Sequence, residues 1–224
     1  MLTSVDGKVT GDFLQNESCQ RACEIYYEIN RNTKSNGFIC GRVTMEGSFT
    51  NCWYPDLSHY EAELDSKGDC IFEDTKGFYA VAFDTNGKLG WKSNRIIDPD
   101  GDPGYDGARI IEVLSENVDK RYLSYLKSMQ IPYIFAGKDK IDVKTALLKL
   151  KEKFLIDTLL LEGGSIINGA FKMADAVDEL SLVVVPVTAD SDDKPLFYNS
   201  TFSEFRLENC CEKDGVLILN YKKK

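Results

Sequence analysis

The chain has 224 residues, 43% of them hydrophobic and 28% charged, a balance typical of a globular protein with one large domain or two small ones. The formal net charge of −9 argues against a nucleic-acid partner, and no apolar run is long enough to cross a membrane. The seven scattered cysteines do not form a small-domain disulfide framework, and no signal-peptide pattern opens the sequence, so we expect free thiols and a cytoplasmic location.

The sequence excludes several hydrolytic and metal-dependent classes. It holds one histidine, His59, and no Cys-x-x-Cys pair, so it cannot build the ligand set of a zinc deaminase or a metalloprotease. A Ser-His-Asp hydrolase would depend on His59, which lies in a segment rich in tyrosine and acids with no nucleophile elbow nearby. We therefore expect no metal site and interpret His59 as a surface residue.

Strands and helices alternate along the chain. Hydrophobic periodicity and turn residues predict strands at 1–4, 38–40, 78–83, 110–114, 133–136, 158–161, 179–186, 205–212 and 216–221, and helices at 17–31, 42–49, 120–129, 142–154 and from 165 through 171. The last two strands flank Asp214-Gly215, a hairpin signal. This order predicts an α/β sandwich with a mainly parallel sheet and an antiparallel C-terminal hairpin.

The junction after the strand at 158–161 is the strongest functional signal. Glu162 ends the strand, Gly163 and Gly164 follow, and Ser165 is a good N-cap for the next helix. Glycines let a backbone approach a diphosphate closely, and the free N–H groups of a helix start point at the anion. The junction therefore indicates a phosphate site, although a simple turn would give the same pattern.

Three further clusters carry chemistry. Ser4-x-Asp6-Gly7-Lys8 is a tight turn, for which a solvated lysine is the simpler interpretation. Gly41-Arg42-x-Thr44 puts a cation at a helix start, where it opposes the helix dipole unless an anion or an acidic partner lies beside it. Asp84-Thr85 ends a strand, and a hydroxyl at the carboxyl end of a strand is well placed for a ligand in an open α/β sheet.

These motifs, with Glu162-Gly-Gly164 and the strand from Asp178 to Pro186, resemble in order and spacing the reductase domain of the bacterial riboflavin-biosynthesis deaminase–reductase. The resemblance covers nearly the whole chain. It implies a single domain over 1–224 with the three-layer sandwich fold of dihydrofolate reductase, and NADPH as the cofactor. It also implies a homodimer assembled through the late strands, 183–186 and 217–221.

The resemblance implies roles for individual residues. It places the NADPH diphosphate against Gly163, Gly164, Ser165 and the N–H groups of Ile166 and Ile167. It places the adenosine 2′-phosphate among Gly41, Arg42, Thr44 and Thr85. Asp6, Lys8 and Glu162 would face the substrate, a ribosylamino-pyrimidine phosphate reduced by hydride transfer, and protonation could come through Asp6, Lys8 or water.

Some features depart from the family pattern. The deaminase half is missing, only three residues precede the Ser4 turn, which suggests a natural chain that starts before Met1, and the acidic segment 52–76 is unusually long. The substrate therefore stays open between that pyrimidine and another small heterocyclic or carbonyl compound. A dihydrofolate reductase, in which Glu24 or Glu28 would face a pteridine, and a non-catalytic NADP-binding protein are the alternatives.

Overall fold

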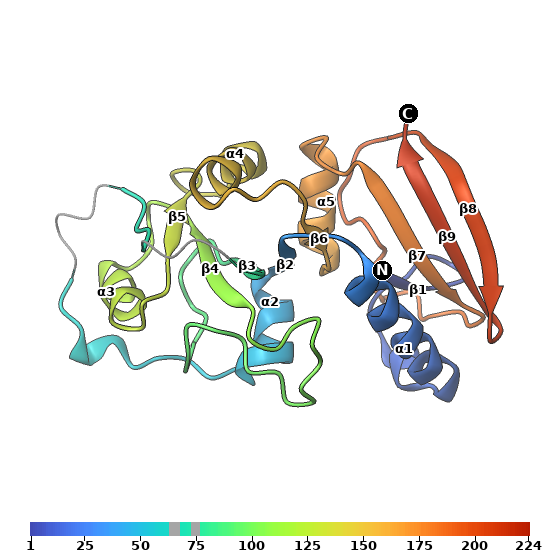
Figure 1. Cartoon of the computed structure of the whole chain (residues 1–224), viewed down its shortest axis with the longest axis horizontal. Coiled ribbons are helices and arrows are strands. Elements are labelled where there is room, and N and C mark those ends of the chain that lie inside the picture. The colour runs from blue at the N-terminus through green and yellow to red at the C-terminus, as the bar shows by residue number, and fades with distance from the viewer. Residues whose placement is uncertain (63–67, 73–76) are drawn as a thin grey trace. The chain divides into compact units, whose positions relative to one another are not determined.

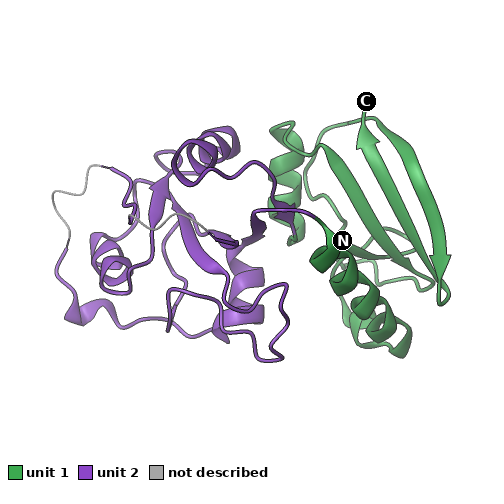
Figure 2. Ribbon diagram, in the orientation of Figure 1, with its two compact units in different colours: residues 1–33, 162–224 green, residues 34–161 purple. Residues whose placement is uncertain are grey.

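The computed structural model describes residues 1–62, 68–72 and 77–224. The chain forms two compact units, shown in different colours in Figure 2. Unit 1 combines the two chain ends, residues 1–33 and 162–224, and unit 2 is the continuous segment 34–161. Of the acidic segment 52–76, residues 63–67 and 73–76 lie outside the described residues.

Unit 2 is built on a parallel sheet. Its five strands have the order β5-β4-β3-β2-β6, with every neighbouring pair parallel. The strands are β2 (Gly37–Gly41), β3 (Tyr79–Phe83), β4 (Arg109–Leu114), β5 (Tyr133–Phe135) and β6 (Leu160–Leu161). β3 is buried throughout, as expected for an apolar strand covered on both faces of a parallel sheet.

Helices on both sides of this sheet give unit 2 three layers: α4 (Val143–Phe154) on one side, α2 (Arg42–Met45) and α3 (Lys120–Ser128) on the other (Figure 1). The predicted apolar stripe of α3, Leu123 and Leu126, is buried, and the predicted N-cap Asp142 accepts the N–H of Thr145. The helix predicted over 42–49 is divided, because α2 passes into a π-helix, η2 (Glu46–Thr50). A short 3-10 helix, η3 (Leu57–His59), follows.

Unit 1 packs one long helix against a mixed sheet. Its strands β1 (Leu2–Ser4), β7 (Glu179–Val185), β8 (Phe205–Lys213) and β9 (Val216–Lys223) have the order β1-β7-β9-β8. β1 and β7 are parallel, and the other pairs are antiparallel. A short 3-10 helix, η1 (Asp12–Gln15), precedes α1 (Glu17–Asn32). Three α1 side chains share a buried core with the sheet: Cys19, Ala22 and Ile25.

The alternate residues of the unit 1 strands form a second, half-exposed apolar face. Opposite Val184 and Leu182 in β7 lie Leu217 and Leu219 of β9, and Leu207 of β8 pairs with Tyr221. Leu217 is 44% exposed and Leu207 50% exposed. Side chains alternate between the faces of a strand, so this face is the opposite one to that of Val216 and Ile218, which pack in the core with α1.

The predicted α/β class, the mainly parallel sheet and the C-terminal hairpin are confirmed, but one local prediction is wrong. Ser165 is not the N-cap of α5 (Ser165–Met173): Gly164 holds that position, and no side chain caps the helix. The Ser165 hydroxyl instead donates to the backbone carbonyl of Pro195, which is distant in sequence. The predicted strand before it shortens to β6, whose two residues are half-buried.

Candidate functional site

The carboxyl ends of β2 and β3 bring the first group of predicted residues to one edge of the unit 2 sheet. Gly41 pairs with Phe83 in parallel register, so Arg42 and Asp84 each follow directly after neighbouring strand ends. Gly41, Arg42 and Thr44 are partly exposed there, and so is Thr85. Guanidinium and hydroxyl groups on one sheet edge are suitable donors for a phosphate.

Arg42 has an acidic partner at this edge. Its Nη1 donates to Oε1 of Glu46, one helical turn further on, and the two side chains form an ion pair. The Arg42 side chain is 34% exposed, whereas that of Glu46 is only 8% exposed. The sequence left open whether an anion or an acidic side chain lies beside Arg42. The structure provides the acidic side chain, and the guanidinium still reaches solvent.

Asp84 organises the loop that carries Thr85. Its Oδ2 accepts the backbone N–H groups of Lys88 and, at 2.8 Å, Leu89. Ser115 holds the carbonyl of Thr85 through its own N–H at 3.2 Å and its hydroxyl at 2.7 Å. These bonds fix the backbone of the predicted phosphate-binding threonine.

A second buried carboxylate, Glu112, lies beneath this edge in the middle of β4. Its Oε1 accepts from the indole of Trp91 and, at 3.3 Å, from the hydroxyl of Tyr122. Burial raises the pKa of Glu112 well above its usual value, and the charge of Asp84 adds to the rise. Burial also raises the pKa of Asp84, although three backbone N–H groups and Arg42 oppose that rise.

Glu46 and Glu112 belong to this region but were not among the residues predicted from the sequence. For Glu112 a signal was present, because it is the single acid within the apolar run Ile110 to Leu114. An acid in a buried strand costs free energy unless its carboxylate has hydrogen-bond or charge partners or stays protonated, so its presence indicates such an environment.

In unit 1 the predicted diphosphate residues lie around the start of α5. Gly163 has a φ of +100°, in the region that favours glycine, and the Gly163–Gly164 peptide is cis. Ser165 and Ile167 are buried, and Ile166 is exposed. The helix has nine residues, long enough for its first N–H groups to favour an anion.

The Asp6–Lys8 turn lies next to this helix start through the segment around Pro195. Lys8 and Pro195 form an antiparallel bridge, and the carbonyl of Pro195 accepts the Ser165 hydroxyl. The N–H of Leu196 donates to the carbonyl of Gly7. The structure therefore brings the predicted Asp6–Lys8 turn and the Gly163–Ser165 turn into one neighbourhood of unit 1.

The three predicted substrate-facing side chains have partners within unit 1. The ammonium of Lys8 donates to the carbonyls of Ser191, at 3.0 Å, and Asp193, at 2.6 Å. Asp6 is exposed and accepts the N–H of Ala189 at 3.1 Å; its pKa is lowered by a hydrogen bond with Ser4 and by this backbone bond. Glu162 accepts from the amide of Asn30 on α1 at 3.0 Å.

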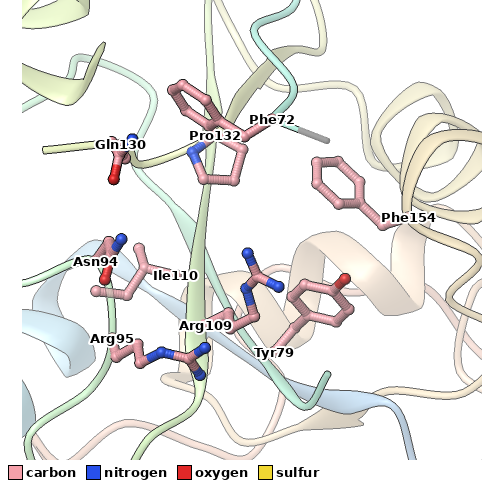
Figure 3. Close-up of a pocket in the computed structure, with 9 residues that line it drawn as sticks. All are labelled: Phe72, Tyr79, Asn94, Arg95, Arg109, Ile110, Gln130, Pro132 and Phe154. Atoms are coloured by element: carbon pink, nitrogen blue, oxygen red, sulfur yellow. The ribbon is translucent and has the colours of Figure 1, made fainter. Parts of the chain in front are cut away.

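Unit 2 contains a small cavity (Figure 3). Its volume is about 40 Å³, and its lining includes Tyr79 and Arg109, the first residues of β3 and β4. It therefore lies at the strand end opposite to that of Arg42 and Thr85. Such a volume holds a few waters, far below the several hundred Å³ of a cofactor pocket, and none of the predicted site residues lines it.

The next two findings, on metal ligands and on membrane-spanning helices, concern only the described residues. Among them, no cluster of His, Cys, Asp and Glu could hold a metal ion, and no helix is long and apolar enough to cross a membrane. His59 lies on the surface beside Asp56, as predicted, and no disulfide bond joins the cysteines of the described part of the chain. Glu28, one acid that a dihydrofolate reductase would have needed, is paired with Lys213.

Fold and site together define an α/β protein with phosphate-compatible groups at strand and helix ends. The chain belongs to the family of RibD C-terminal domains, because the family model of that description matches residues 1–219. No curated protein sequence matches the chain. The predicted family is therefore confirmed across both units.

Solved structures show the same fold at low sequence identity. A pyrimidine reductase-like protein from Corynebacterium diphtheriae superposes with a TM-score of 0.67 at 14% identity, covering 100% of this chain and 89% of that one. The Saccharomyces cerevisiae riboflavin biosynthesis reductase Rib7 gives 0.63 at 16%, covering 100% and 87%. Acinetobacter baumannii RibD gives 0.64 at 17%, covering 100% of this chain and 56% of that longer protein.

The family supports an oxidoreductase of riboflavin biosynthesis. This function, the main prediction from the sequence, is favoured over the two alternatives, a dihydrofolate reductase and a non-catalytic NADP-binding protein.

Proposed function

We propose that the two units act as one NADPH-dependent reductase domain over residues 1–224, which reduces a ribosylamino-pyrimidine phosphate in the cytoplasm. The observation that carries the proposal is the pairing of β2 with β3, which puts Arg42 and Thr85 on one sheet edge in a chain of the RibD C-terminal family. The substrate class agrees with a Thermotoga maritima neighbour, described as a deaminase and 5-amino-6-(5-phosphoribosylamino)uracil reductase.

The donor set of unit 2 fits the 2′-phosphate of NADPH. Arg42 would supply a charged hydrogen bond, and Thr44 and Thr85 would supply hydroxyls; these side chains are partly exposed at the sheet edge. Arginine presents several N–H groups in one plane, so a phosphate can bind it while Nη1 keeps Glu46.

The residues of unit 1 would bind the diphosphate and the substrate. The turn at Gly163 and Gly164 and the N–H groups of Ser165, Ile166 and Ile167 would hold the diphosphate, for which a helix start without a capping side chain is suited. When bound, NADPH would supply the hydride. The chain's own residues would orient the acceptor carbon and supply a proton from the Asp6–Lys8 turn or from water.

The half-exposed apolar face of β7, β8 and β9 supports a homodimer. Exposed apolar patches of this kind mark interaction surfaces, and the two exposed leucines, Leu217 and Leu207, lie on adjacent strands of the sheet. A second copy of the chain presents the same apolar face, so the two faces can pair about a twofold axis.

A fluorescence titration with NADPH and NADH tests the cofactor. We expect tighter binding of NADPH, and Arg42→Ala should weaken it roughly ten- to a hundred-fold, because a charged hydrogen bond contributes about 1.5–3 kcal/mol. Arg95→Ala is the matched control, since Arg95 is an exposed arginine of the same unit that donates to the carbonyl of Gly107. Equal affinity for the two dinucleotides in the unmutated chain would contradict the 2′-phosphate assignment.

A further inference from the structure

We propose that Glu46 and Asp84 are specificity-determining residues: these two buried carboxylates flank Arg42 and limit how strongly the chain prefers a dinucleotide with a 2′-phosphate over one without it. The inference rests on the proposed function, because it concerns the same sheet edge. Neither acid carried a ligand role in the sequence motifs.

Glu46 competes directly for the cation. It accepts from Nη1 of Arg42 across one helical turn, and its residue is only 6% exposed, so its negative charge is poorly screened by water. A phosphate that approaches Arg42 must share the guanidinium with this carboxylate. The attraction of the phosphate to Arg42 is therefore partly cancelled by its repulsion from Glu46.

Asp84 adds a second negative charge from the neighbouring strand end. In the register of β2 and β3, Asp84 and Arg42 each follow directly after one of two paired strand ends, and the charge of Arg42 opposes the rise that burial causes in the pKa of Asp84. Its Oδ2 is held by the Lys88 and Leu89 N–H groups, while its buried Oδ1 has no hydrogen-bond partner among the described residues. The carboxylate is thus fixed in place rather than free to turn away from an incoming anion.

The charge balance follows from these contacts. One guanidinium faces two carboxylates, so the three side chains together are negative, whereas the 2′-phosphate is an anion. Dinucleotides that lack this phosphate do not meet the repulsion. The two acids should therefore lower the affinity for NADPH and leave that for NADH unchanged.

Isosteric amides separate charge from structure. Glu46→Gln keeps an oxygen that can accept from Arg42, and Asp84→Asn keeps one for the Lys88 and Leu89 N–H groups, but each removes a charge. We expect each variant to raise the ratio of the NADH to the NADPH dissociation constant about three- to tenfold, between the effect of an exposed ion pair and that of a charged hydrogen bond. The NADH constant should change by less than about twofold on the same reasoning.

Asp157→Asn is the control, because it removes the same formal charge from an exposed ion pair with Lys151 in the same unit. An unchanged ratio in Glu46→Gln overturns the inference, and a lower ratio overturns it too, since Glu46 would then be orienting Arg42 toward the phosphate. If Asp84→Asn fails to fold, Glu46→Gln still decides. If the unmutated chain binds neither dinucleotide, both the proposed function and this inference fail. If it binds both equally, the 2′-phosphate assignment fails, and this inference fails with it; if it prefers NADPH and Glu46→Gln leaves that preference unchanged, the inference alone fails.

Discussion

Replacing the buried Glu112 by glutamine should change how the stability of the protein depends on pH. Glutamine keeps an oxygen for the Trp91 indole and the Tyr122 hydroxyl, and it replaces Oε2, which has no hydrogen-bond partner among the described residues. The variant therefore removes a titratable proton with little change of volume.

The magnitude follows from proton linkage. In the unfolded chain Glu112 ionises near its usual value of 4.5, whereas in the folded chain burial raises its pKa well above that. Between these two pKa values the folded state binds one more proton than the unfolded state. The contribution of Glu112 to the free energy of unfolding is therefore fully present below pH 4.5 and is lost as the pH rises toward the folded-state pKa. One such proton contributes a slope of about 1.4 kcal/mol per pH unit.

The assay is urea unfolding followed by tryptophan fluorescence at several pH values between about 5 and 8. The chain holds two tryptophans, Trp53 and Trp91, and both lie in unit 2 with Glu112, so the signal reports on the unit that carries the change. Trp91 is itself the hydrogen-bond donor to Glu112. We expect the fall of stability with pH to be shallower in Glu112→Gln than in the unmutated chain.

The control is Glu116→Gln, which changes an exposed acid just beyond the end of β4 and should shift stability by less than about 0.5 kcal/mol at every pH. Equal slopes of stability against pH in the unmutated chain and in Glu112→Gln would contradict a raised pKa of Glu112. A steeper slope in Glu112→Gln would contradict it as well.

Three further predictions concern binding, catalysis and assembly. Gly164→Val should abolish dinucleotide binding and leave the circular dichroism spectrum unchanged, because a branched Cβ would occupy the diphosphate position; an unfolded variant would instead assign the glycine to backbone geometry. Lys8→Ala should lower kcat/KM for the ribosylamino-pyrimidine phosphate at least about tenfold, or about 1.4 kcal/mol, with NADPH affinity unchanged, and normal turnover would mean that its bonds to two carbonyls are its whole role. Light scattering should give a dimer of the 25.2 kDa chain, which Leu217→Arg converts to monomers and the exposed Leu148→Arg on α4 does not; a monomer in the unmutated chain would refute the homodimer.

Local sequence signals predicted most of the fold. The β-branched run before Pro186, the Asp142 cap and the Asp214-Gly215 turn all act over a few residues, and the structure has β7, α4 and the β8–β9 hairpin where they indicated. The carboxyl ends of β2 and β3 meet at one edge, which agrees with the common phosphate site that the family resemblance implied for Arg42 and Thr85.

Partners that are distant in sequence could not be predicted in this way. The Ser165 hydroxyl donates to the carbonyl of Pro195, and the Lys8 ammonium donates to the carbonyls of Ser191 and Asp193. These partners lie far away in the sequence, so the local motifs around Ser165 and Lys8 could not indicate them. The pKa of Glu112 is raised by burial in the folded chain and by the charge of Asp84, and the hydrogen bonds from Trp91 and Tyr122 oppose that rise. Such groups depend on tertiary packing, which periodicity does not encode.

The division of the chain has a consequence for its synthesis. Unit 2 is one continuous segment, whereas the sheet of unit 1 needs Leu2 to pair with Val183, a residue made long afterwards. As the chain leaves the ribosome, residues 34–161 can complete their sheet before the strands that cover the apolar face of α1 have been made. We therefore expect unit 2 to fold first and unit 1 to close only after β7 and β9 emerge, with the long-range pairing of β1 as the slow step.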